Sequence, residues 1–255
     1  MSTMSKTEML VLAKKQLGLD LACSPASFDS YENSIVVSKL PDGRRLFSKE
    51  RDFFKMATFG CGTVISADEK IIGWCTEHLM NREGIRLFEL NAIYKIESEL
   101  RKYEKHLSGI GEFYLPFRGV SRKKALHPTA EAKWFEKNEI PQLYSDKRFK
   151  NALLYEMEGL RPDILVVAAL IGGQFAAMAG ASMDSELFWQ IGIDVMPEHR
   201  KKGLAAYLVS ELTEEILKRN AVPYYGTWSA NIASRSVAAA SGYFPAWVET
   251  YAKDL

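Results

Sequence analysis

One segment dominates the sequence: Val195-Met196-Pro197-Glu198-His199-Arg200-Lys201-Lys202-Gly203-Leu204-Ala205-Ala206. Apolar residues before it predict a strand, and the apolar spacing after Gly203 predicts a helix. The first turn of a helix leaves about four backbone N–H groups unpaired at the positive end of the helix dipole. Gly203 and Ala205 keep this end open to a ligand. The segment therefore predicts an anion site of the kind that binds a diphosphate.

Three basic residues of the turn, Arg200, Lys201 and Lys202, add positive charge at the same place. A solvated basic turn is the simpler interpretation of such a run. The strand before it and the amphipathic helix after it favour a phosphate site instead.

Elements of both kinds alternate around this segment. We predict helical segments at 130–144 and 149–157, strands at 164–171, 174–182 and 188–195, a helix at 204–219, a strand at 224–228, a helix at 234–241 and a strand at 247–251. This alternation predicts a mixed α/β sheet. Residues 164–181 are the most membrane-like stretch, but Gly172 and Gly173 divide them into two runs of strand length, whereas a membrane-spanning helix needs about 20 apolar residues.

The first half of the chain predicts a smaller α+β domain. Ser5 and Glu8 form a capping-box pattern for a helix that ends near Gly18. The segments 34–40 and 44–48 predict a hairpin around a turn at 41–43, and the apolar spacing of 88–107 predicts a helix. Glycines at 109 and 111 interrupt the pattern, so we place one domain at 1–110 and another at 111–255.

Composition excludes several classes of partner. The 33 basic and 32 acidic side chains give a net charge of +1 and no global field for nucleic acid or a membrane. The basic run at 122–124 has no interleaved aromatic residues, which favours a solvated linker over a nucleic-acid contact. Three cysteines and four histidines show no metal-ligand spacing, so we expect no metal and a reduced, cytoplasmic setting.

Two motifs together resemble the GNAT acetyltransferase superfamily. Its acetyl-CoA signature, Arg/Gln-x-x-Gly-x-Gly/Ala after a strand ending in Val-x-Pro, is similar to Arg200-x-x-Gly203-x-Ala205 after Val195-Met196-Pro197. A second signature is matched in register by Asn231, Ser234 and Gly242-Tyr243. The resemblance covers about 140 residues and is closest to a bacterial subgroup with an extra N-terminal domain.

The resemblance implies the α/β (α+β) GNAT acyl-CoA N-acyltransferase fold, with a mixed central sheet and a smaller N-terminal α+β domain. It implies acetyl-CoA as cosubstrate, with pantetheine inserted where the strand before the phosphate turn splays from its neighbour. Ile193 and Val195 would pair with the pantetheine amides, and Asn231 with Ser234 would contact the pantetheine arm. The diphosphate would lie against Arg200, Lys201, Lys202, Gly203, Leu204, Ala205 and Ala206. Few residues follow Gly242-Tyr243, so we expect the N-terminal region to complete the sheet or cover its edge.

Direct attack of an amine on the thioester needs alignment, oxyanion stabilisation and one deprotonation. Ala238 stands where relatives usually have a tyrosine acid, and Trp189 and Gln190 stand where many have a glutamate base. Ser234 or a water would then replace the acid. The candidate bases are Asp194, Glu186 and Asp184. A strand-end role is the alternative for Asp194, and a role in a polar turn is the alternative for Glu186 and Asp184.

The sequence therefore predicts an N-acetyltransferase that moves an acetyl group from acetyl-CoA to a primary amine of a small molecule or peptide. The alternative is a catalytically inactive CoA-binding sensor or interaction module, suggested by Ala238 and Gln190. No feature of the sequence sets the oligomeric state, and a homodimer is one option.

Overall fold

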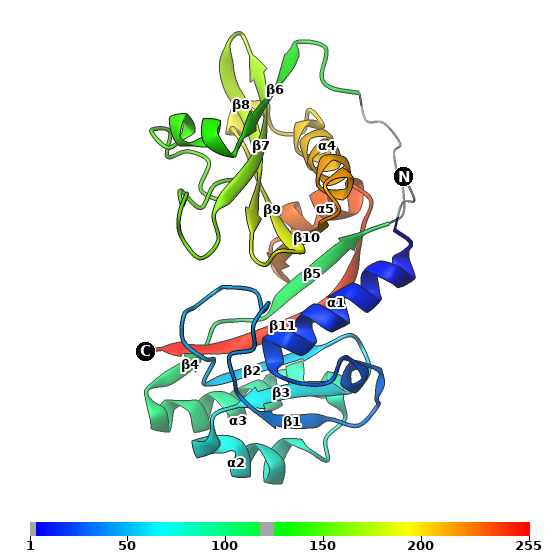
Figure 1. The fold of residues 1–255 in the computed structure, drawn as a ribbon, viewed down its shortest axis with the longest axis vertical. Helices are drawn as coiled ribbons and strands as arrows, with labels where there is room; N and C mark the ends of the chain where they lie inside the picture. Colours follow the sequence, from blue (N-terminus) through cyan, green and yellow to red (C-terminus); the bar gives the residue numbers. More distant parts are fainter. Residues whose placement is uncertain (1–3, 118–124) are drawn as a thin grey trace.

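The structure, a computed structural model, describes residues 4–117 and 125–255 (Figure 1). The basic run at 122–124 lies outside the described residues. The described strands form one mixed sheet in the order β1-β3-β2-β11-β5-β10-β9-β8-β7-β6, and β4 pairs with β11 off this path. The sheet therefore runs through both halves of the chain.

The strands of this sheet are β1 (Ser34–Val37), β2 (Phe54–Thr58), β3 (Thr63–Ala67), β4 (Lys105–Leu107), β5 (Gly111–Pro116), β6 (Ala130–Glu136), β7 (Asp163–Ile171), β8 (Gln174–Met183), β9 (Phe188–Val195), β10 (Val222–Trp228) and β11 (Tyr243–Asp254). The α-helices are α1 (Lys6–Leu21), α2 (Glu69–Leu79), α3 (Leu90–Leu100), α4 (Leu204–Lys218) and α5 (Ile232–Ala240). Shorter 3-10 helices lie at Pro25–Asp29, Gly84–Phe88, Arg101–Tyr103, Lys137–Leu143 and Pro197–His199.

The predicted order of elements after residue 160 is confirmed. The glycines at 172 and 173, both with positive φ, turn the chain between β7 and β8, and both strands are largely buried. β9, α4, β10, α5 and β11 follow as predicted, with β11 longer at both ends. In the part of the chain that the structure describes, no helix has the length and apolar character to cross a membrane.

Several local predictions are wrong. The segments 34–40 and 44–48 do not form a hairpin, because β1 pairs in parallel with β3 and no strand is assigned at 44–48. Residues 130–136 form strand β6 rather than a helix and pair antiparallel with β7. Residues 149–157 are not helical. Helix α1 begins with the predicted Ser5 and Glu8 capping box but continues past Gly18 to Leu21.

The N-terminal half extends the sheet, as expected. β2 pairs antiparallel with β11, and β5 lies between β10 and β11, antiparallel to both. Figure 1 shows α1 along this central part of the sheet. Residues of α1 share an apolar cluster with Tyr224, Phe244 and Trp247 of the C-terminal half. The two halves therefore share a core, and the division near residue 110 stays a prediction.

Candidate active site

The parallel ladder between β9 and β10 ends inside the sheet. Its pairs run from Val222 with Phe188 to Tyr225 with Ile191, and within the described chain no later pair joins the two strands. Beyond this point β9 stays paired with β8 as far as Val195, while β10 stays paired with β5. The two strands therefore diverge and leave an opening with unpaired backbone on both sides.

The predicted phosphate turn lies at the end of β9. Lys201 and Gly203 have φ angles of 61° and 77°, so the turn folds through the left-handed region. Gly203 precedes α4 without a side-chain cap, and a Cβ at this residue would meet no atom within 4 Å. The first N–H groups of α4 are thus available to a ligand, as the sequence predicts. Arg200 and Lys202 contact the turn itself: Arg200 Nε donates to the Val195 carbonyl at 3.3 Å, and Lys202 Nζ lies 3.2 Å from His199 Nδ1.

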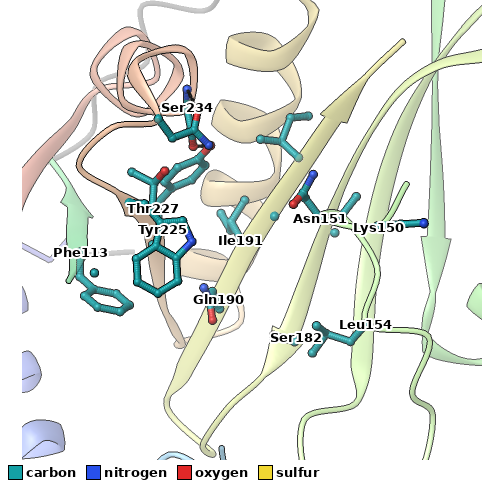
Figure 2. Close-up of a pocket in the computed structure, with 18 of the residues that line it drawn as sticks. Phe113, Lys150, Asn151, Leu154, Ser182, Gln190, Ile191, Tyr225, Thr227 and Ser234 are labelled. Atoms are coloured by element: carbon teal, nitrogen blue, oxygen red, sulfur yellow. Dashed lines mark hydrogen bonds between the residues drawn. The ribbon is translucent and has the colours of Figure 1, made fainter. Parts of the chain in front are cut away.

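A cavity of about 1400 Å³ contains the opening. Side chains alternate between the two faces of a strand. Ile191 and its alternate neighbours pack with the apolar cluster under α4, whereas Gln190 and Asp194 face Arg161 and Asn151 on the other face. Figure 2 shows Tyr225 and Ser234 on one side of β9 and Asn151 on the other. Because residues from both faces line the cavity, it passes through the sheet between β9 and β10.

Most of the predicted cofactor residues line this cavity. They are Ile193, Val195, Arg200, Lys201, Gly203, Leu204, Ala205, Ala206, Asn231 and Ser234. Lys202 is not among the lining residues. Asn231 caps α5 by accepting the Ser234 N–H at 3.1 Å, so these two residues are fixed to each other.

The structure separates two of the predicted bases, Asp194 and Glu186, and buries the third, Asp184, in an ion pair with Arg161. Asp194 lines the cavity, but its carboxylate accepts the N–H groups of Asn151 and Ala152 at 2.7 and 3.0 Å and the Asn151 side-chain amide at 2.6 Å. Asp194 therefore anchors residues 151 and 152 to the end of β9. This is the strand-end hydrogen-bonding role that was the alternative to a catalytic base. Glu186 is exposed in the turn before β9 and does not line the cavity. The geometry supports none of the three carboxylates as the base.

Ser234, the predicted acid, contacts Tyr225, which no sequence motif marks as an acid. The Tyr225 hydroxyl lies 2.8 Å from Ser234 Oγ and lines the cavity beside the opening. Burial is the main cause that raises the pKa of Tyr225, so the phenol stays protonated at neutral pH. Ala238, at the family's tyrosine position, is fully buried. Finding Tyr225 required the register of β10 against β9, which no local motif encodes.

On the other face, a buried polar network surrounds the start of β9. Arg161 donates to both carboxylate oxygens of Asp184, at 2.7 and 3.0 Å, and to Gln190 Oε1 at 2.5 Å. Tyr224 donates to the same Asp184 carboxylate. The network fixes Gln190 in the cavity at the position where a carboxylate base was expected.

Comparisons with known proteins relate this site to a family. Residues 142–247 match the family model described as GNAT acetyltransferase. This segment contains the diverging strands, the phosphate turn and α5. Residues 142–247 therefore form a region that is similar to the GNAT acetyltransferase family. The comparison with curated proteins found no match.

Solved structures resemble the chain distantly. A putative GNAT acetyltransferase from Novosphingobium aromaticivorans is 16% identical with a TM-score of 0.44, over 58% of this chain and 66% of that one. A GNAT acetyltransferase from Colwellia psychrerythraea is 11% identical with a TM-score of 0.45, over 98% of each chain. An aminoglycoside N-acetyltransferase in complex with CoA is 16% identical with a TM-score of 0.36, over 46% of this chain and 89% of that one. At these values the solved structures carry no argument about substrate.

Proposed function

We propose that this protein transfers an acetyl group from acetyl-CoA to a primary amine, by direct attack in a ternary complex. The opening between β9 and β10 carries the proposal, because its unpaired backbone can hold the pantetheine amides as an added strand would. The open N-terminus of α4 lies at the end of the same cavity, where the diphosphate would bind. Three cationic residues, Lys150, Arg200 and Lys201, line the cavity as partners for the phosphates.

The reaction needs few side chains. The neutral amine nitrogen forms a bond to the thioester carbonyl carbon, the C–S bond breaks, and the thiolate of CoA leaves. The nitrogen releases one proton to solvent, and solvent restores the proton of the group that protonates the thiolate. Backbone N–H groups of β9 beyond Ile191 are placed to stabilise the oxyanion. We assign to Tyr225 the proton that the leaving thiolate takes up, with Ser234 holding the phenol in place.

Titration calorimetry with acetyl-CoA and CoA tests the cofactor half of the proposal, and thiol release with a panel of primary amines tests the chemistry. Micromolar binding with amine-dependent thiol release supports the enzyme. Binding of acetyl-CoA without thiol release with any of the amines supports the alternative, a CoA-binding module. This alternative is suggested by Gln190 and Ala238, which stand at the family's base and acid positions. The three free cysteines, Cys23, Cys61 and Cys75, support a reduced cytoplasmic setting for either activity.

A further inference from the structure

The end of the cavity away from α4 is walled by the N-terminal half of the chain. Lining residues of this wall are Phe47, Ser48, Glu50, Arg51, Asp52, Phe53 and Lys55. Gln190 and Phe113 of the C-terminal half line the same cavity. An acceptor that reaches the opening from this face would therefore contact the N-terminal half.

Asp52 is the less exposed of the two carboxylates of this wall, Glu50 and Asp52. Its side chain is 32% exposed, and its nearest cation, Lys55 Nζ, is 3.9 Å away. Lys55 Nζ is also 3.9 Å from Glu249, so two carboxylates share one ammonium. Within residues 4–117 and 125–255, no hydrogen bond reaches the Asp52 carboxylate. A direct ionic hydrogen bond would be about 2.7–2.9 Å long, so Asp52 still has room for a cation.

Asp52 belongs to a cluster of ion pairs in which carboxylates outnumber cations. Arg45 is fully buried and pairs with Asp20 at 2.5 Å and Glu249 at 2.7 Å. The described cluster thus has three carboxylates, Asp20, Asp52 and Glu249, against two cations, Arg45 and Lys55. Ion pairs around the same end of the cavity join Arg51 with Asp68, Lys105 with Asp254 and Arg161 with Asp184. Glu50 and Lys253 also line the cavity, and Lys39 and Arg44 line a small pocket that includes Asp52.

Burial, the largest cause, raises the pKa of Asp52, and the charges of Glu249 and Asp20 act in the same direction, against those of Lys55 and Arg45. An ionised carboxylate here costs free energy of folding, as is common where a charge serves a ligand. The N-terminal wall of the cavity therefore carries a partly exposed carboxylate that accepts no hydrogen bond from the described residues.

The reacting nitrogen is a poor permanent partner for this carboxylate. An alkylamine with a pKa of ~10.4 must lose a proton before it attacks, and a carboxylate beside it would stabilise the unreactive ammonium. A second cationic group has no such conflict. The aromatic rings of Phe47, Phe53 and Phe113 line the same part of the cavity and suit an apolar spacer between two amines.

We propose that the acceptor carries a second, non-reacting cationic group, and that Asp52 of the N-terminal half is the counter-ion that positions it. This inference rests on the proposed acetyltransferase activity. It makes the N-terminal half part of the acceptor site, and it makes Asp52 a specificity residue rather than the base.

Three acceptors of equal chain length test the charge at the distal end: hexamethylenediamine, hexylamine and ε-aminocaproate. Each presents one primary amine to the thioester at a time, and the other end is cationic, neutral or anionic. The two amines of the diamine are equivalent, so its kcat/KM is halved before the comparison. Thiol release from acetyl-CoA gives kcat/KM for the native protein, Asp52→Asn, Asp52→Lys and the control Asp42→Asn. Asp42 is exposed, lies in the same half and does not line the cavity.

We expect the native protein and Asp42→Asn to prefer the diamine over hexylamine by about tenfold or more, and ε-aminocaproate to be the poorest acceptor. Asp52→Asn should reduce the difference to roughly threefold or less, and Asp52→Lys should favour ε-aminocaproate. Calorimetry should give each variant the native affinity for acetyl-CoA, which also shows that it is folded.

The inference is overturned if Asp52→Asn keeps the native preference for the diamine over hexylamine. It is also overturned if the native protein binds acetyl-CoA but does not prefer the diamine, or acetylates none of the three acceptors. Loss of acetyl-CoA binding by the native protein overturns the proposed function itself, and the two failures are thereby distinguished.

Discussion

Ile191 of β9 and Tyr225 of β10 are the last pair of residues that join these two parallel strands. The Tyr225 hydroxyl, 2.8 Å from Ser234 Oγ, therefore lies at the apex of the opening through the sheet. A thioester bound in this opening would have its sulfur close to a phenol that belongs to the strand and not to the following helix.

Replacing Tyr225 by Phe should lower kcat by about tenfold to a hundredfold, because the leaving thiolate loses its proton donor. The acetyl-CoA Kd should change by less than about threefold. Tyr243→Phe is the matched control, since the Tyr243 hydroxyl lies 2.6 Å from Thr213 Oγ1 outside the cavity. Stopped-flow and steady-state thiol release measure both. An equal loss of kcat in the two variants would show that the effect is structural.

Gly192→Ala should destabilise the protein by about 1–3 kcal/mol. A Cβ at Gly192 would lie 1.8 Å from the Asn151 carbonyl oxygen, so the segment that Asp194 holds would have to move. Gly73→Ala in α2 has open space around its Cβ and should stabilise by about 0.5–1 kcal/mol. Urea unfolding of both variants checks this, and a neutral result for Gly192→Ala contradicts the close approach.

Glu249 should make stability depend on acid pH. Burial raises the pKa of Glu249, but the charges of Arg45 and Lys55 outweigh it and hold this pKa below its usual value. A lowered folded-state pKa gives stability that is present above the unfolded pKa of about 4.3 and is lost as pH falls through the folded value. Glu249→Gln should flatten this loss and cost about 3–5 kcal/mol at pH 7, because Arg45 loses a buried partner. Unfolding free energies measured across acid pH test both effects.

The contribution of Asp52 to stability should change with pH in the opposite direction to that of Glu249. The folded-state pKa of Asp52 is raised, mainly by burial, so its contribution is favourable below the unfolded pKa and is lost as pH rises through the folded value. Asp52→Asn should therefore raise the melting temperature at pH 7, and the gain should shrink in acid. A lower melting temperature at pH 7 would mean that Asp52 stabilises the wall, which would weaken its assignment to a ligand.

Local signals in the sequence predicted much of the C-terminal fold. Gly172 and Gly173 mark a tight turn between two apolar runs, and Gly203 marks the start of a helix after a strand. Such signals depend only on neighbours in the chain. Residues 130–136 were misassigned because their strand state depends on pairing with β7, which lies some thirty residues away.

The candidate site, like the fold, was predictable only where its residues are neighbours in the chain. The phosphate turn is continuous in sequence, so local signals mark it, and most of its residues line the cavity. Its role in binding a phosphate stays a prediction. Tyr225 and Asp52 were not assigned, because the first depends on strand register and the second on the folding of residues 47–55 against the central sheet. Asp194 was named, but its three hydrogen bonds to residues 151 and 152 could not be read from the sequence.

The most direct test of the account is calorimetric titration of acetyl-CoA into the native protein, Gly203→Glu and Gly203→Ala. Both substitutions place a side chain in open space at a φ of 77°, so they share the same backbone strain and differ in the charge beside the diphosphate site. The account predicts micromolar binding by the native protein, near-native binding by Gly203→Ala and loss of binding by Gly203→Glu. No binding by the native protein, or equal binding by the two variants, would contradict it.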